Sequence, residues 1–141
     1  MRSAALENAT EVCVPVSSDD DLVTARRAGR VMAEQLGFSA REATLVATAI
    51  SELARNIVAH AKQGEIHLKP VNGSSRRGIT VVARDRGPGI ADPRRASQLG
   101  QSASGAFGLG LPGVRRIMDA FDISSVPGHG TTIAVTKWKR Q

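Results

Sequence analysis

The spacing of hydrophobic positions changes several times along the chain, and each change predicts a new element. Valines alternate with other residues over residues 10–16, which predicts a strand. Apolar residues then recur at helical spacing over about 21–36 and again over about 40–63, which predicts two helices. Gly37 and Gly64 follow these stretches, and we expect them to end the helices.

The residues at the starts of both predicted helices are typical of N-terminal caps. Asp19, Asp20 and Asp21 place carboxylates at the positive end of the first helix dipole. Ser39 and Glu42 have the three-residue spacing of a capping box at the start of the second helix. The sequence therefore defines where both helices begin.

Two further strands are expected at 65–71 and 79–84, where apolar and β-branched residues gather. The residues between them, 72–78, have the glycine- and serine-rich composition of an exposed hairpin loop. Residues 86–107 are rich in glycine, serine, alanine, proline and arginine. Because loops of that length are uncommon in compact domains unless they have a role, we expect a functional loop there.

A short helix and a second hairpin complete the pattern. Pro112 suits the first turn of a helix over about 111–120, and strands are expected at 122–126 and 131–138. The order β-α-α-β-β-α-β-β groups strands without strict alternation, which predicts an α/β (α+β) fold. We expect a two-layer sandwich of a mixed, mostly antiparallel sheet and helices, with residues 1–141 in one domain.

Composition narrows the class of protein. Hydrophobic residues make up 41% of the chain and charged residues 23%, which is typical of a globular protein. The lone cysteine, Cys13, excludes an internal disulfide, and its alternation with valines indicates a strand cysteine. No leader peptide and no apolar run of about 20 residues is apparent, so a cytoplasmic protein without a membrane segment is expected.

The net positive charge lies in the second half of the chain. Residues 1–70 hold 8 Lys/Arg and 9 Asp/Glu, a net −1, whereas residues 71–141 hold 11 and 4, a net +7. A basic half suits a polyanion such as ATP, or an acidic protein partner. Nucleic-acid binding is disfavoured because aromatic residues are only 3% and the arginines come as scattered pairs.

Glu52 and Asn56 are the first candidate pair for chemistry. Their four-residue spacing puts them on one face of the second predicted helix. A carboxylate beside an amide can serve an attacking hydroxyl and a phosphate-bound Mg²⁺, an ion that prefers oxygen ligands. Taken alone, the pair is more simply explained by a solvated helix face, which is the usual setting of such residues.

Asp85 and two glycines form the second candidate. Asp85 ends a valine-rich strand, where a carboxylate can accept a hydrogen bond from the amino group of adenine. Gly87 and Gly89 lack side chains and would let a base lie close to the backbone. The same residues are also typical of a plain turn.

Gly108, Leu109 and Gly110 precede the last predicted helix. Glycines at a helix N-terminus expose backbone N–H groups to an anion, and the helix dipole favours negative charge there. In the loop before them, Arg94 or Arg95 is a candidate contact for a terminal phosphate, although a solvated arginine is the simpler interpretation of each.

The order of these motifs resembles the GHKL ATPase/kinase superfamily. Residues 51–56 (SELARN) resemble its N box, residues 85–89 (DRGPG) its G1 box and residues 108–111 (GLGL) its G2 box. The resemblance extends from about residue 10 to Trp138 and implies a Bergerat-type fold with an ATP lid at about 90–107. Within the superfamily, the chain is most similar to the RsbT-type stressosome switch kinases.

This resemblance implies roles for individual residues. Asn56 would bind Mg²⁺, and Glu52 would be the general base. Asp85, Gly87 and Gly89 would hold adenine, and Gly108, Leu109 and Gly110 would hold the phosphates. A threonine of the final strand would contact the base, and we favour Thr131 over Thr132.

The resemblance also implies partners. Kinases of this family phosphorylate serine or threonine on STAS-domain scaffold proteins and, once released, activate an effector such as a PP2C-type phosphatase. Two alternatives remain: an anti-sigma factor with serine kinase activity, and a nucleotide-binding module without chemistry. The presence of both Glu52 and Asn56 argues against the module without chemistry, which would not need a general base.

Other chemistries have weaker support in the sequence. His60, His67 and His129 lie within predicted helix, strand and turn, so we do not expect histidine autophosphorylation. One cysteine and dispersed histidines show no zinc-ligand spacing, so no zinc site is predicted. The Walker A spacing is absent, which excludes a P-loop protein.

Overall fold

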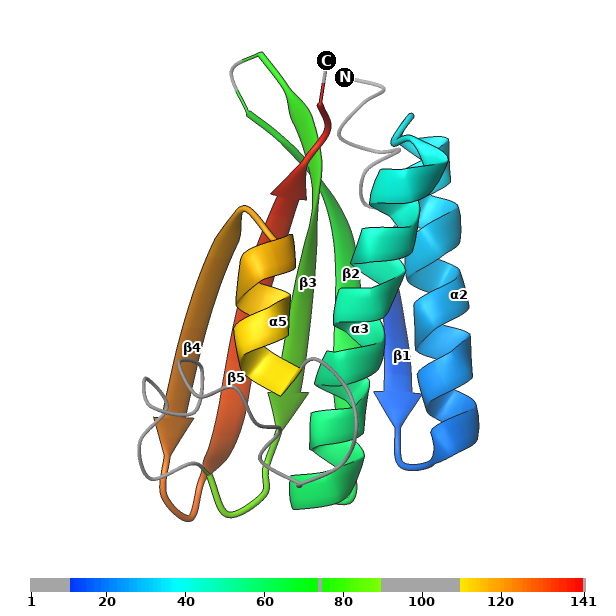
Figure 1. Ribbon diagram of the computed structural model, residues 1–141. Coiled ribbons are helices and arrows are strands. Elements are labelled where there is room, and N and C mark those ends of the chain that lie inside the picture. Colours follow the sequence, from blue (N-terminus) through cyan, green and yellow to red (C-terminus); the bar gives the residue numbers. More distant parts are fainter. Residues whose placement is uncertain (1–10, 74, 90–109, 141) are drawn as a thin grey trace.

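The computed structural model describes residues 11–73, 75–89 and 110–140, in which helices cover one face of a single sheet (Figure 1). The elements are β1 (Val12–Val16), α2 (Asp19–Gln35), α3 (Ala40–His60), β2 (Gly64–Asn72), β3 (Arg77–Asp85), α5 (Gly110–Ile117), β4 (Ala120–Val126) and β5 (Gly130–Trp138). This order and the two layers confirm the predicted α/β sandwich.

The sheet has the order β1-β2-β3-β5-β4, and its four pairings are all antiparallel in the described part of the chain. The expectation of a mostly antiparallel sheet is therefore confirmed, and the described pairings include none of the parallel ones that a mixed sheet would have. Two helices connect β1 to β2, so the chain returns to the end of the sheet that it left. β5 lies between β3 and β4, which separates the two strands that are joined through α5.

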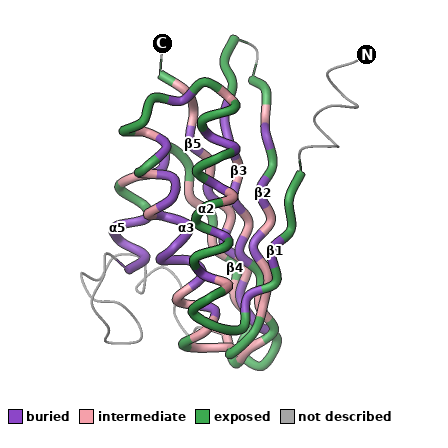
Figure 2. The backbone as a smooth tube through the Cα atoms, turned by 90° about the vertical axis from the view of Figure 1, so that its right-hand side faces the viewer, coloured by how far each residue is buried: buried purple, intermediate pink, exposed green. Residues whose placement is uncertain are grey.

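The core lies between the sheet and α3. Ile50, Leu53 and Ile57 of α3 are buried against inward-facing side chains of the sheet such as Ile66 and Val81. Figure 2 shows the two layers from the side, with buried residues gathered where the helices meet the strands. The alternate residues of the strands form the opposite face of the sheet, which no described helix covers (Figures 1 and 2).

Side-chain caps begin both long helices. Ser18 accepts a hydrogen bond from the Asp21 amide at 3.4 Å and is the N-cap of α2, so Asp19, Asp20 and Asp21 occupy its first turn. Ser39 accepts from the Glu42 amide at 3.1 Å, as expected of a capping box. The predicted starts of the helices therefore agree with the structure to within about a turn.

Gly37 follows the end of α2 with a φ of 91°, as expected of a helix terminator, but the predicted end of α3 was less accurate. α3 ends at His60, and Lys62 adopts a φ of 69°, so the chain turns before Gly64. Gly64 instead begins β2, where a side chain would collide with the carbonyl oxygen of Arg84 on the next strand. Its small size serves strand pairing rather than helix termination.

The short helix α5 also ends earlier than predicted, at Ile117. The Asp119 amide donates to the Thr136 carbonyl at 2.9 Å, so pairing with β5 begins only two residues after the helix. Lys137 of β5 is only 4% exposed and donates through Nζ to the Ile117 carbonyl at 3.0 Å. A buried cation therefore satisfies the negative end of α5.

None of the helices in the described part of the chain is long and apolar enough to cross a membrane.

The cap of α3 yields a first prediction. Ser39→Ala removes the acceptor of the Glu42 amide, so the free energy of unfolding should fall by about 0.5–2 kcal/mol in urea denaturation. Ser39→Asp restores a capping oxygen and should regain most of that loss. Equal stability of the alanine variant and the wild type would contradict the capping role.

Candidate active site

A pocket lies where one end of the sheet meets α3 and the start of α5. Several residues predicted for nucleotide binding line it: Asn56 from α3, Asp85 from β3, Gly89 from the turn after β3, and Thr131 from β5. Leu53, Leu111 and Ile133 supply apolar walls. Motifs that are far apart in the sequence are thus brought to one site by the sheet order.

The carboxylate of Asp85 is oriented by backbone hydrogen bonds. Its Oδ1 accepts from the Gly87 amide at 2.9 Å and from the Thr131 amide at 3.2 Å. Both bonds to described residues use the same oxygen, so Oδ2 remains as an acceptor. An adenine amino group is a donor that fits this second oxygen.

Successive side chains of β5 point to opposite faces of the sheet, so the two candidate threonines lie on different faces. Thr131 is 7% exposed, lines the pocket, and has its hydroxyl 2.8 Å from that of Ser125 on β4. Thr132, one residue later, points to the opposite face of the sheet because strand side chains alternate. Thr131 is therefore the threonine that the pocket offers to a ligand.

Steric contacts that the sequence did not indicate explain why residues 87 and 89 are glycines. A Cβ on Gly87 would lie 2.6 Å from the Cβ of Ala61, at the end of α3. Gly89 adopts a φ of +80°, and a Cβ there would lie 2.7 Å from the carbonyl oxygen of Val126. Tight packing and a left-handed backbone thus require glycine at these positions.

Glu52 is buried beside the pocket rather than lining it. Its side chain is 8% exposed, and its Oε2 forms an ion pair with Arg55, one turn along α3. Its Oε1 accepts a hydrogen bond of 2.9 Å from the amide of Gly110, the first residue of α5. The carboxylate therefore links α3 to the positive end of α5.

This bond bears on the predicted role of Gly110. Its amide donates to Glu52 in this arrangement, so it must exchange partners before it can donate to a phosphate. Gly108 and Leu109, the predicted lid at 90–107, and Arg94 and Arg95 lie outside the described residues.

His60 is a pocket residue that the sequence analysis did not identify as such. It lines the pocket, and its buried Nε2 has no hydrogen-bond partner among the residues that the structure describes. Buried polar atoms normally have partners, so an unpaired nitrogen indicates a ligand or water position. The signal was present in the sequence, because His60 follows Asn56 by one helical turn.

These features fit an adenine nucleotide. Asp85 Oδ2 offers an acceptor, His60 Nε2 an unpaired nitrogen, and Leu53 and Ile133 the apolar walls that a base requires. For Mg²⁺, the amide oxygen of Asn56 is a suitable ligand type on the pocket wall.

Comparison with known proteins identifies relatives over most of the chain. The family described as Histidine kinase-like ATPase domain matches residues 16–137. Serine/threonine-protein kinase RsbT of Bacillus subtilis (strain 168) is 45% identical, over 91% of this chain and 96% of that protein. Anti-sigma F factor of Thermoanaerobacter sp. (strain X514) is 29% identical, over 81% of this chain and 82% of that protein.

A solved structure shows the same fold. The crystal structure of the RsbU and RsbW domains of a Mycobacterium tuberculosis protein superposes with a TM-score of 0.63. The match covers 93% of this chain and 33% of that chain, at 18% identity. The GHKL-type fold expected from the motifs is thus confirmed by sequence and by structure.

The hydrogen bonds of Asp85 predict the effect of Asp85→Asn. Two amides hold Oδ1, so the asparagine oxygen must occupy that position and its NH₂ group must replace Oδ2. A donor would then face the adenine amino group. ATP binding, measured by calorimetry, should weaken by about 1–3 kcal/mol.

Inosine triphosphate is the matched control ligand, because it carries an oxygen where adenine carries the amino group. The wild type should prefer ATP, and Asp85→Asn should lose or reverse that preference. An unchanged ATP preference in the variant would show that Asp85 does not read the base.

Proposed function

Because this chain belongs to the histidine kinase-like ATPase family and is a serine/threonine-protein kinase within it, we propose that it phosphorylates STAS-domain proteins as a partner switch. In this role, it modifies serine or threonine on a STAS-domain scaffold of the stressosome. After release, it activates an effector such as a PP2C-type phosphatase.

The observation that carries the proposal is the 45% identity to a serine/threonine-protein kinase over almost the full length of both chains. The site geometry supports it. Glu52 and Asn56 lie one turn apart on α3, next to the pocket that presents Asp85 and Thr131.

The proposed mechanism assigns one role to each of these side chains. ATP supplies the γ-phosphoryl group, and Mg²⁺ neutralises phosphate charge when both are bound. Asp85 accepts a hydrogen bond from the base, and Asn56 offers its amide oxygen to the metal. Glu52 orients the attacking hydroxyl and accepts its proton. Positioning and electrostatic stabilisation then provide most of the rate enhancement.

Glu52 has a structural bond as well as the proposed catalytic role. Its bond to the Gly110 amide fixes the carboxylate at the start of α5. Arg55 compensates its charge through the other oxygen. Both oxygens of Glu52 are thus occupied in this arrangement, so in the proposed role the carboxylate has to exchange one of these contacts for the attacking hydroxyl.

A second candidate function rests on the other relative. The identity of 29% to Anti-sigma F factor of Thermoanaerobacter sp. (strain X514) supports a protein that sequesters a sigma subunit and releases it through kinase activity. A pull-down with a STAS-domain protein and a sigma factor distinguishes the two candidates. Binding to the sigma factor alone would favour the second.

Phosphoryl transfer itself can be measured directly. The protein is incubated with Mg·ATP and a single-domain STAS protein, and the intact masses of both are recorded. We expect one added phosphate on the STAS protein and none on this chain. ATP binding without any transfer would refute the proposed substrate class.

Two substitutions at Glu52 separate its structural bond from its catalytic role. Glu52→Gln keeps an acceptor for the Gly110 amide but loses the ion pair with Arg55 and cannot accept a proton, so transfer should fall by about 10²–10⁴-fold, with a smaller loss of stability than in Glu52→Ala. Glu52→Ala also leaves that amide unpaired and should cost a further 1–3 kcal/mol, roughly, in urea unfolding. Full activity of the glutamine variant would exclude Glu52 as the base.

Asn56→Ala tests the proposed metal ligand. The substitution removes the amide oxygen, so Mg·ATP-dependent transfer to the STAS protein should be lost. Metal-free nucleotide binding should change little, because Asp85 and the apolar walls remain. Retained transfer in Asn56→Ala would show that another group holds the metal.

A further inference from the structure

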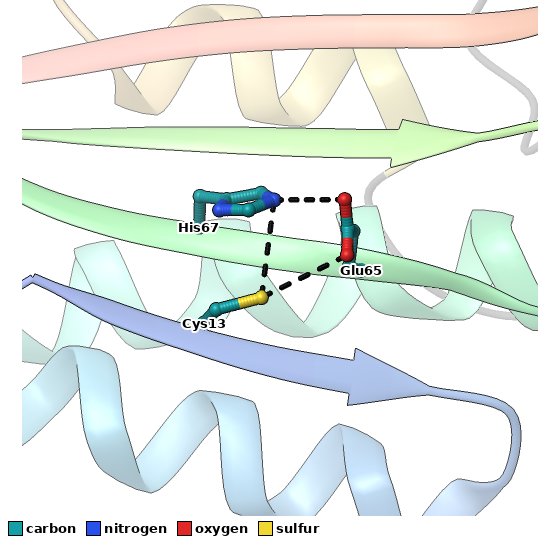
Figure 3. Close-up of side chains that lie close together, drawn as sticks. All are labelled: Cys13, Glu65 and His67. Atoms are coloured by element: carbon teal, nitrogen blue, oxygen red, sulfur yellow. Dashed lines mark hydrogen bonds and ion pairs between the residues drawn. The ribbon is translucent and has the colours of Figure 1, made fainter.

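Three side chains of metal-ligand type meet on the face of the sheet that no described helix covers. Figure 3 shows Cys13 of β1 with Glu65 and His67 of β2, all pointing toward one another. Cys13 Sγ lies 3.8 Å from Glu65 Oε2 and 3.9 Å from His67 Nε2. His67 Nε2 lies 3.0 Å from Glu65 Oε1. One ligand atom from each of the three side chains therefore lies within 4.8 Å of the other two.

The strand register produces this cluster. Cys13 is directly opposite His67 in the β1–β2 pairing, and Glu65 is the partner of Pro15, two residues along. Glu65 and His67 are also two apart on β2, so their side chains share one face of the sheet. Cross-strand neighbours on one face lie close enough for direct contact.

The triangle of donor atoms has the size that a tetrahedral zinc ion requires. Zn–S bonds of about 2.3 Å and Zn–N or Zn–O bonds of about 2.0–2.2 Å place neighbouring ligand atoms roughly 3.3–3.7 Å apart. The observed contacts of 3.0 to 3.9 Å run through both oxygens of Glu65, and one ligand atom from each side chain lies within 4.8 Å of the others, so small rotations of these exposed side chains would reach that spacing. We propose that Cys13, Glu65 and His67 bind one Zn²⁺ ion, with a water molecule as the fourth ligand.

A catalytic thiol is the main alternative, and the geometry disfavours it. A histidine that activates a cysteine uses one ring nitrogen for the thiol and the other for the orienting group. Here Cys13 and Glu65 both contact the same nitrogen, Nε2 of His67.

The charge and exposure of the cluster fit a divalent ion that can enter and leave. A thiolate and a carboxylate contribute two negative charges, and a neutral imidazole adds none. The side chains of His67 and Glu65 are 37% and 42% exposed, so solvent reaches the site. Sulfur and imidazole ligands favour zinc over Mg²⁺ or Ca²⁺, which prefer oxygen.

Zinc at this position would join two strands. β1 is an edge strand whose one neighbour in the sheet is β2, and the proposed ligands come from both. An ion that binds the folded state stabilises it by mass action. Zinc at this site would thus stabilise the pairing of β1 with β2, and this effect would be independent of the kinase reaction.

Cobalt(II) titration tests the proposal, because Co²⁺ adopts zinc geometries and absorbs visibly. The probe is added to reduced, tag-free and nucleotide-free protein. We expect a thiolate-to-cobalt charge-transfer band that saturates at one ion per chain and disappears when Zn²⁺ is added. Cys13 is the one cysteine in the sequence, so that band reports this residue alone. Absence of the band would overturn the proposal.

Ligand variants give an independent readout. Cys13→Ser should remove the charge-transfer band. Glu65→Gln and His67→Gln should each weaken zinc binding at least about tenfold, the loss typical even of residues behind the ligands. His129→Gln, in the exposed turn between β4 and β5, is the matched control and should bind as the wild type does. Zinc affinity unchanged in His67→Gln would refute the site.

Thermal unfolding completes the test. A zinc concentration of about a hundred times the Kd should raise the Tm of the wild type by roughly 5–10 °C. Cys13→Ser is a mild change at an exposed position, so it should fold, and zinc should leave its Tm unchanged. An equal shift in both proteins would place the zinc elsewhere on the chain.

Discussion

A buried carboxylate sets the arrangement of the candidate active site. Removing the charge of Glu52 from water is costly unless it is compensated. Arg55 compensates one oxygen and the Gly110 amide the other, so α5 must begin next to α3. The pocket between these helices and the ends of β3 and β5 exists because this contact fixes where α5 starts.

The sequence predicted the parts of the fold that depend on local chemistry. Helix starts followed from Ser39 and the aspartates after Ser18, because a cap is made by residues within one turn. The end of α3 was misjudged, because Gly64 is glycine on account of Arg84, a residue that is distant in the sequence. The sheet was fully antiparallel because of where β5 inserts, and no periodicity in the sequence records that.

In the candidate site, too, the sequence predicted what short motifs determine and missed what contacts between distant residues determine. Asp85 and Thr131 were predicted from motif resemblance, and both line the pocket. The bond between Glu52 and Gly110, and the packing of Gly87 against Ala61, depend on three-dimensional contacts. The cluster of Cys13, Glu65 and His67 was missed for this reason: more than fifty residues separate its cysteine from its histidine, and only strand register unites them.

The two ends of α5 are held by opposite charges from other elements. Glu52 of α3 meets the N-terminal amide, and Lys137 of β5 meets the Ile117 carbonyl at the other end. A helix of 8 residues is too short to be stable by itself in water. Both contacts favour the same orientation of its dipole. The orientation of this helix is therefore fixed by the fold before any anion arrives, and the rearrangement that a phosphate requires is confined to the contact between Glu52 and the first amide of the helix.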